Sequence, residues 1–278
     1  MDLVKRYRYL FLLIGALILF AIGSLFGIVP VYFIARVKYG YSQELTSQLI
    51  SLFSNYYSNE ILETGQTYAE YASEFFAANP DYFTAIKYLC ALLQLISYGP
   101  LVVFIVIFLY KDLIEDAKKM KSDYKRNLLI VVIGFFSMLV LSYIVNIIYA
   151  IFGNDGTSVN ESTLQLMMQS PGKWYLLIAV VIFAPICEEI IFRKLLIDTF
   201  EKSFKLKPVI AIAVSAFLFA LIHVSDCESF IYIFQYLALA IPLCLVYHCS
   251  NNNIYVSILV HMANNLLVGI TYLIEYGI

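Results

Sequence analysis

Three apolar stretches of this chain carry side chains that can donate or accept protons. In chain order they hold Glu188, Glu189 and Arg193, then His223, then His261 and Asn265. Ionisable groups within membrane-spanning segments are costly, and they usually face the interior of a helix bundle. Each of these side chains is therefore a candidate for function.

The two adjacent glutamates are expected to have different roles. Glu189 and Arg193 are four residues apart, so on a helix they share a face and can form an ion pair. Glu188 lies about 100° around the same helix and has no such local partner. We therefore expect Glu188 to be free for chemistry. The alternative for Glu189 and Arg193 is a purely structural ion pair.

The combination of groups fits amide hydrolysis. A carboxylate held beside a neutral imidazole, such as Glu188 beside His223, can take a proton from water. His261 and Asn265 are one helical turn apart and can both donate to a developing oxyanion. Counted at 1.5 Å per residue from the expected cytosolic helix ends, all four groups lie at a depth of about 15–24 Å. They are thus expected near the middle of a bilayer.

The motifs resemble those of one known family. Glu-Glu-x-x-x-Arg at Glu188, Phe-x-x-x-His at Phe219 and His-x-x-x-Asn at His261 occur in this order on separate apolar segments. Together they resemble the type II CAAX prenyl protease and bacteriocin-processing (Abi, or CPBP) family. The resemblance covers about residues 174–269.

This resemblance implies an intramembrane endopeptidase. It implies that Glu188 and His223 activate water, that His261 and Asn265 stabilise the oxyanion, and that Glu189 and Arg193 support the site. The implied substrate is a membrane-associated protein or peptide. Within the family, substrates range from prenylated proteins to bacteriocins, pheromones and surface proteins.

Two catalytic types remain open. Glu188, His223 and His261 could hold Zn²⁺ with one open position, as in a metallopeptidase. A glutamate-type peptidase without a cofactor is favoured, because Arg193 is expected to occupy Glu189 and the chain lacks the His-Glu-x-x-His motif.

Composition places the protein in a membrane. The chain has 278 residues, of which 62% are hydrophobic and only 14% charged, whereas soluble domains carry about 25% charged residues. The net charge of −2 gives no indication of nucleic-acid binding. The five cysteines show neither metal-ligand spacing nor a disulfide pattern.

The expected fold class is all-α, a multi-spanning transmembrane helix bundle of about seven to eight spans. Each of seven apolar runs is close to or above the ~20 residues that cross a bilayer, although the fifth is short. A re-entrant eighth segment is the alternative. The seven runs are residues 10–35, 83–110, 127–152, 174–200, 208–224, 229–249 and 254–276.

The basic residues predict the orientation. Lys and Arg concentrate in segments 1–9, 111–126 and 201–207, which places the N-terminus in the cytosol. We divide the chain into an N-terminal transmembrane region, residues 1–172, and a catalytic core, residues 173–278. The outer loop 36–82 shows apolar residues at helical spacing, and we interpret it as a packing cap or a substrate-gating lid.

Two other classes of function remain as alternatives. A membrane scaffold or bacteriocin-immunity protein would keep the fold but act by binding a partner. A proton-coupled transporter would show an inverted repeat of broken helices, and no such repeat is visible. The composition, rich in Lys, Ile, Tyr and Asn, favours a bacterial plasma membrane.

Overall fold

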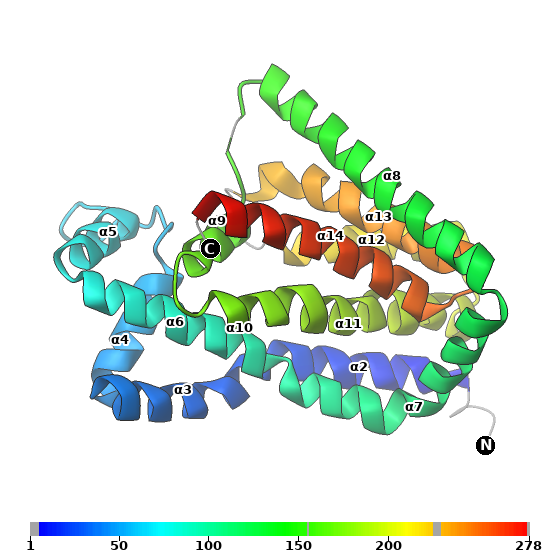
Figure 1. The fold of residues 1–278 in the computed structure, drawn as a ribbon, viewed down its shortest axis with the longest axis horizontal. Coiled ribbons are helices and arrows are strands. Elements are labelled where there is room, and N and C mark those ends of the chain that lie inside the picture. Colours follow the sequence, from blue (N-terminus) through cyan, green and yellow to red (C-terminus); the bar gives the residue numbers. More distant parts are fainter. Residues whose placement is uncertain (1–5, 155, 225–228, 277–278) are drawn as a thin grey trace.

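The computed structural model describes residues 6–154, 156–224 and 229–276. These residues form helices and connecting turns, and their only extended pairing is an isolated bridge between Ile61 and Thr67. The prediction of an all-α, multi-span bundle is therefore confirmed. The two ends of the chain lie apart, since α2 begins at one end of the bundle and α14 finishes at the other (Figure 1).

The helices follow one another closely along the chain. In order they are α2 (Arg8–Ala21), α3 (Gly23–Tyr39), α4 (Gln43–Ser54), α5 (Tyr68–Ala78), α6 (Pro80–Ser97), α7 (Gly99–Ser122), α8 (Tyr124–Ile151), α9 (Val159–Met168), α10 (Lys173–Ile178), the π-helical η1 (Ala179–Phe183), α11 (Ala184–Glu189), the π-helical η2 (Ile190–Ile197) and η3 (Thr199–Ser203), α12 (Pro208–Ile222), the 3₁₀ turn η4 (Ser229–Tyr232), α13 (Ile233–Cys249) and α14 (Ile254–Tyr276).

Six helical segments are long and apolar enough to cross a membrane in the part of the chain that the structure describes. They match six of the seven predicted spans. The remaining prediction, residues 208–224, corresponds to α12, which has 15 residues. At 1.5 Å per residue this helix is about 22 Å long, shorter than the ~30 Å hydrocarbon layer. Because α12 ends at Ile222, His223 lies at a helix end rather than within a span.

The second long segment is interrupted at Tyr98, between α6 and α7, as Pro100 suggests. A matching interruption at Ile22 separates α2 from α3. The two breaks lie together, because a Cβ on Gly23 would approach the carbonyl oxygen of Ser97 to 2.5 Å. Glycine is therefore required where these helices touch.

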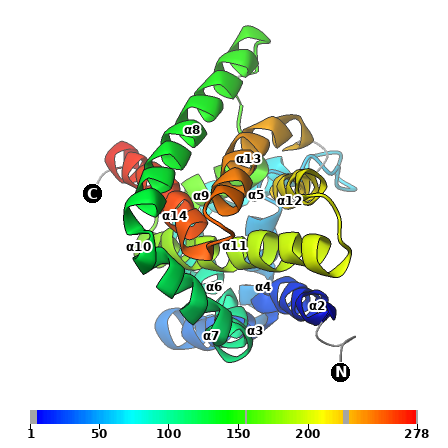
Figure 2. The same cartoon turned by 90° about the vertical axis from the view of Figure 1, so that its right-hand side faces the viewer.

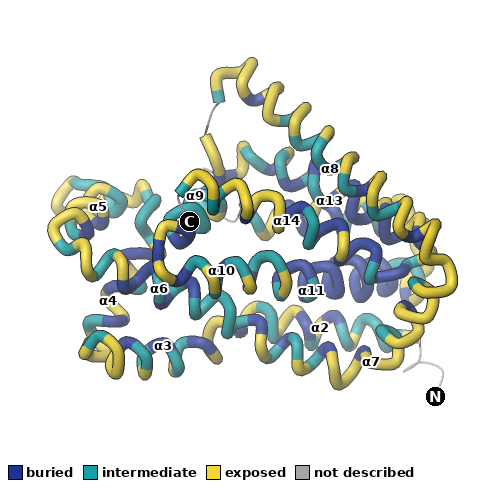
Figure 3. Tube along the Cα trace, in the orientation of Figure 1, coloured by how far each residue is buried: buried dark blue, intermediate teal, exposed yellow. Residues whose placement is uncertain are grey.

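The segment from α10 to η3 is the centre of the bundle. It is the most buried of the six candidate spans, whereas α8 is the least buried. Helices α2 and α7 lie on one side of it, and α12, α13 and α14 on the other (Figures 1 and 2). Figure 3 shows the same contrast, with exposed residues along α8 and buried residues along α11. The central segment is the one that carries the glutamate motif.

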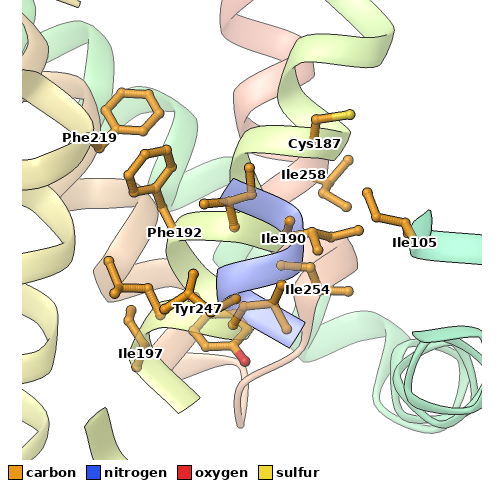
Figure 4. Packing of buried hydrophobic residues seen from close by; sticks show 14 of the residues in the cluster. Ile105, Cys187, Ile190, Phe192, Ile197, Phe219, Tyr247, Ile254 and Ile258 are labelled. Carbon is orange, nitrogen blue, oxygen red and sulfur yellow. The ribbon is translucent and has the colours of Figure 1, made fainter. Parts of the chain in front are cut away.

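Aromatic and branched side chains pack around this central segment. The rings of Phe192 and Phe219 meet nearly edge-on at 5.5 Å and join η2 to α12. On the other side of the motif helix, Cys187 and Ile190 point toward Ile105 of α7 (Figure 4). The motif helix is thus held from both sides by apolar contacts.

The loop predicted over residues 36–82 contains α4 and α5. Their apolar faces are buried against α6, where Leu49, Leu52 and Phe76 join Ile86 and Leu89 in one cluster. These helices lie at the same end of the molecule as α9 and the end of α14 (Figure 1).

A cluster of charged residues lies at the opposite end. We call it the helix-end cluster and define it as Asp116, Lys194, Asp198 and Lys202. Lys194 donates to Asp116 at 2.6 Å, and Lys202 donates to Asp198 at 2.7 Å. The first ion pair joins the end of the central segment to α7. The second lies within the central segment itself.

Candidate active site

The six motif residues surround or adjoin one cavity. Its volume is about 210 Å³, and its wall includes Glu188, His223, His261 and Asn265. Glu188 comes from α11, His223 from the end of α12, and the other two from α14. The structure therefore brings together four residues from three helices that are separate in the sequence.

The two glutamates differ in burial and contacts, as their helical positions suggest. Glu188 is 7% exposed and lines the cavity, whereas Glu189 is fully buried. Arg193 Nη1 lies 3.0 Å from Glu189 Oε1, so the predicted pair is formed. The guanidinium also lies 4.5 Å from the centre of the Phe219 ring, and its Nη2 donates to the carbonyl of Ala240 at 3.3 Å.

His261 occupies the space between both glutamates, a contact that spacing along the chain did not predict. Its Nδ1 lies 2.9 Å from Glu189 Oε1, and its Nε2 lies 3.9 Å from Glu188 Oε2. A carboxylate paired with arginine acts as an acceptor, so Nδ1 carries the proton and donates to Glu189. In the neutral ring, Nε2 is then the unprotonated nitrogen, and it faces Glu188.

His223 is oriented by the helix that it ends. Its Nδ1 lies 2.8 Å from the carbonyl oxygen of Phe219, which can only accept a hydrogen bond. The ring stacks on Tyr236 with centroids 4.8 Å apart. Nδ1 therefore carries the proton in the neutral ring. This leaves Nε2 with a lone pair, as in His261.

Asn265 is fixed by a backbone defect in the central segment. In η1 the N–H of Ala184 donates to the carbonyl of Ala179, five residues earlier. The next donor in that series would be residue 185, but Pro185 has no N–H. The carbonyl of Val180 instead accepts from Nδ2 of Asn265 at 2.8 Å.

The second N–H of that amide remains available at the cavity wall. Asn264 supports this orientation, because its Nδ2 donates to Asn265 Oδ1 at 3.3 Å. Asn264 also lines the cavity.

Several wall residues were missed by reasoning from the sequence. Tyr236 on α13 stacks on His223, and its hydroxyl lies 2.6 Å from that of Ser158. The helix break brings Tyr98 to the cavity, and α9 brings Asn160 and Glu161. None of these belongs to a recognisable motif. The polar residues of the short segment 159–168 were the one available signal.

A metal site was the open alternative at this position. Within the described ranges, no group of three His, Cys, Asp or Glu side chains is arranged to hold a metal ion. His261 also directs one ring nitrogen to Glu189, which is itself paired with Arg193. These donors do not fit a Zn²⁺ site, and no step of the reaction below uses one.

Other polar residues act away from the cavity. His248 is exposed near the end of α13, and Gln235 donates to Asn146 at 3.2 Å between α13 and α8. Four cysteines, Cys90, Cys187, Cys244 and Cys249, are free thiols. Cys227 lies outside the described residues.

One comparison with known proteins found a match. Residues 170–267 match the family model of the Rce1-like type II CAAX prenyl endopeptidases. The resemblance predicted from the motifs is confirmed over these residues. No curated protein and no solved structure matches the chain. The six candidate spans and this match together indicate an integral, multi-pass membrane protein with a region similar to these endopeptidases.

Proposed function

We propose that this protein is an intramembrane endopeptidase in which Glu188 activates the attacking water. The observation that carries the proposal is the position of Glu188 on the cavity wall, 3.9 Å from His261 and facing the same space as His223 and Asn265. A base, two imidazoles and an amide donor around one cavity meet the geometric requirements of amide hydrolysis.

The reaction begins with a water molecule between Glu188 and His223. Glu188 accepts one proton of the water as its oxygen attacks the scissile carbonyl carbon. Nε2 of His223 accepts a hydrogen bond from the other hydrogen and orients the attack. This orientation follows from the bond between Nδ1 of His223 and Phe219, which leaves Nε2 as an acceptor.

The oxyanion that forms is stabilised by donors on α14. Asn265 offers its second amide N–H, and His261 offers Nε2–H as an imidazolium that takes its second proton from bulk water before the attack and keeps it through the cycle. The resulting imidazolium is stabilised by Glu189, which already accepts from Nδ1. Preorganised donors of this kind are among the largest contributions to catalysis.

Collapse of the intermediate breaks the C–N bond. Glu188 returns the proton that it took from water to the departing amine nitrogen, so the acid and base roles fall on one carboxyl group. Arg193 takes no part in proton transfer. It pairs with Glu189, which in turn orients His261.

The substrate is a membrane-associated protein or peptide. The cavity is lined mainly by helices that can cross a bilayer, so we expect the cleaved bond to enter the bundle from the membrane or its surface. The concentration of basic residues in segments 1–9, 111–126 and 201–207 supports a cytosolic N-terminus, and the composition supports a bacterial plasma membrane.

The test is the Glu188→Gln variant in lipid nanodiscs. The probe is a library of synthetic apolar dodecapeptides, with new termini detected by mass spectrometry. Glutamine keeps the size of glutamate but accepts no proton, so turnover of the best-cleaved peptide should fall about 10²–10⁴-fold. The control is Glu44→Gln, an exposed glutamate on α4, which should cleave like the unaltered protein.

The thermal unfolding of both variants should match that of the unaltered protein. Equal cleavage by Glu188→Gln and the unaltered protein, including none by either, would overturn the proposal in favour of a partner-binding protein. The same preparations test for metal. A glutamate-type enzyme should keep its activity after dialysis against a chelator, whereas stoichiometric zinc together with activity restored by zinc would assign a metallopeptidase.

A further inference from the structure

The cavity continues beyond the catalytic residues to the short helix α9. Asn160 and Glu161 of this helix line the same cavity as Glu188. The helix is anchored at its start, where Ser158 accepts from the N–H of Glu161 at 3.2 Å and contacts the hydroxyl of Tyr236 at 2.6 Å. Because Tyr236 also stacks on His223, α9 is tied to the catalytic residues through one side chain.

The wall carries acidic side chains but no lysine or arginine. Among the described residues, Glu161 and Glu188 are the ionisable carboxyl groups of the cavity, and no Lys or Arg lines it. The other polar wall residues near α9, Gln94, Tyr98 and Asn160, are neutral. Beyond the histidines of the catalytic site, the cavity therefore offers no basic side chain to a negatively charged substrate.

Glu161 is a carboxyl group that nothing in the mechanism uses. Burial raises the pKa of this carboxyl, and no cation of the described chain offsets that cost. A partly buried carboxylate without a cation is unfavourable, and a cationic partner stabilises it by forming a charge-assisted hydrogen bond. The missing partner can be supplied by the substrate.

We infer that Glu161 is a specificity-determining residue that binds a lysine or arginine side chain of the substrate, located on the α9 side of the scissile bond. This inference rests on the proposed endopeptidase function. It implies that the substrate is an internal segment of a cationic peptide. A substrate recognised by its C-terminal carboxylate would instead bring a negative charge into a cavity with two acidic groups.

Binding is measured on Glu188→Gln, so that peptides are not consumed. The probes are amidated dodecapeptides of otherwise neutral, apolar sequence. A single lysine is placed at each position in turn, and each peptide is compared with its norleucine counterpart. Norleucine keeps the aliphatic chain and lacks the charge. At one position, lysine should bind at least roughly tenfold more tightly than norleucine, as expected for a hydrogen bond between charged groups.

That preference should vanish in Glu188→Gln/Glu161→Gln and persist in Glu188→Gln/Glu44→Gln. A reversed charge gives a second test, because Glu188→Gln/Glu161→Lys should prefer glutamate to glutamine at the same position. The peptide with a free C-terminal carboxylate should bind no better than its amide. A lysine preference that is absent, or unchanged by Glu161→Gln, would overturn the inference.

The two proposals can fail separately. Cleavage that depends on Glu188 without any effect of Glu161 would refute the specificity site and leave the peptidase intact. Lysine binding that depends on Glu161 in a protein that cleaves no peptide would refute the peptidase and leave a site for cationic peptides.

Discussion

Two groups of buried charges lie on the same central segment, and neighbouring residues belong to different groups. Arg193 belongs to the cavity cluster, which we define as Glu188, Glu189, Arg193 and His261. Lys194 belongs to the helix-end cluster with Asp116. Both side chains are almost fully buried. Burial and charge therefore do not separate a site of chemistry from a structural ion pair.

The balance of partners separates them. In the helix-end cluster Asp198 accepts from Lys202 at 2.7 Å and from Tyr247 at 3.3 Å, and Asp116 pairs with Lys194. The cavity cluster has two carboxylates but one arginine, and Arg193 pairs with Glu189. In both clusters some buried polar atoms lack a hydrogen-bond partner among the described residues, Oε2 of Glu189 in one and Oδ1 of Asp116 in the other, but Lys119 approaches Asp116 Oδ1 to 3.5 Å. An excess of acid facing a cavity indicates chemistry, whereas balanced pairs indicate structure.

The largest effect on stability is expected when the neighbouring residues Arg193 and Lys194 are each replaced by alanine. Arg193→Ala leaves Glu189 buried without its cation and should destabilise the protein by about 3–5 kcal/mol. Lys194→Ala should cost less, because Lys119 also lies 3.5 Å from Asp116. Thermal unfolding in nanodiscs measures both losses.

Activity per folded molecule should distinguish the two variants. It should fall in Arg193→Ala, because His261 loses its orientation, and should be preserved in Lys194→Ala. An equal loss of specific activity in both variants would contradict the division into two clusters.

A smaller effect is expected at the amide donor. Asn265→Ala should lower kcat by about 10²–10³-fold, as for the loss of one oxyanion donor. The matched control is Asn146→Ala, which removes an amide from another interhelical hydrogen bond, to Gln235. If the two substitutions lowered kcat alike, Asn265 would act only as a link between helices.

The smallest expected effect concerns pH and Glu161. Because the folded-state pKa of this carboxyl is raised by burial, the folded protein binds its proton more tightly than the unfolded chain does. The stability that this proton contributes is present below the unfolded pKa of about 4.3 and is lost as pH rises through the folded value. Glu161→Gln should therefore raise Tm at neutral pH.

The difference in Tm between Glu161→Gln and the unaltered protein should shrink as the pH is lowered toward 5. Glu44→Gln provides the control for a change of net charge at an exposed site. A gain in Tm that does not depend on pH would show that the carboxyl group is not the cause.

Local patterns in the sequence predicted much of this molecule. Hydropathy predicted the long helices, and the spacing of Glu189 and Arg193 predicted their pair, because both depend on neighbours along one helix. Spacing could not predict the contact between His261 and Glu189, which are 72 residues apart. The same limit applies to Lys194 and Asp116, 78 residues apart.

Two further features depend on how the helices are wound and placed. The π-helical turns before and after α11 have no pattern of apolar residues that distinguishes them from an α-helix. Glu161 joins the cavity because α9 packs against α6, α10 and α14 and is tied to α13 through Ser158 and Tyr236. Its polar surroundings in the sequence are those of an ordinary surface loop.

The hydrogen bond that orients Asn265 depends on the residue at position 185 being proline. With proline at that position the carbonyl of Val180 has no donor from the backbone, and the amide of Asn265 supplies one. Any other residue at 185 would restore an N–H that competes for the same carbonyl and would release the amide from its fixed direction. The two positions are thus epistatic: the fitness of an amide at 265 is set by an imino acid on a different helix, and substitutions at the two sites should not combine additively.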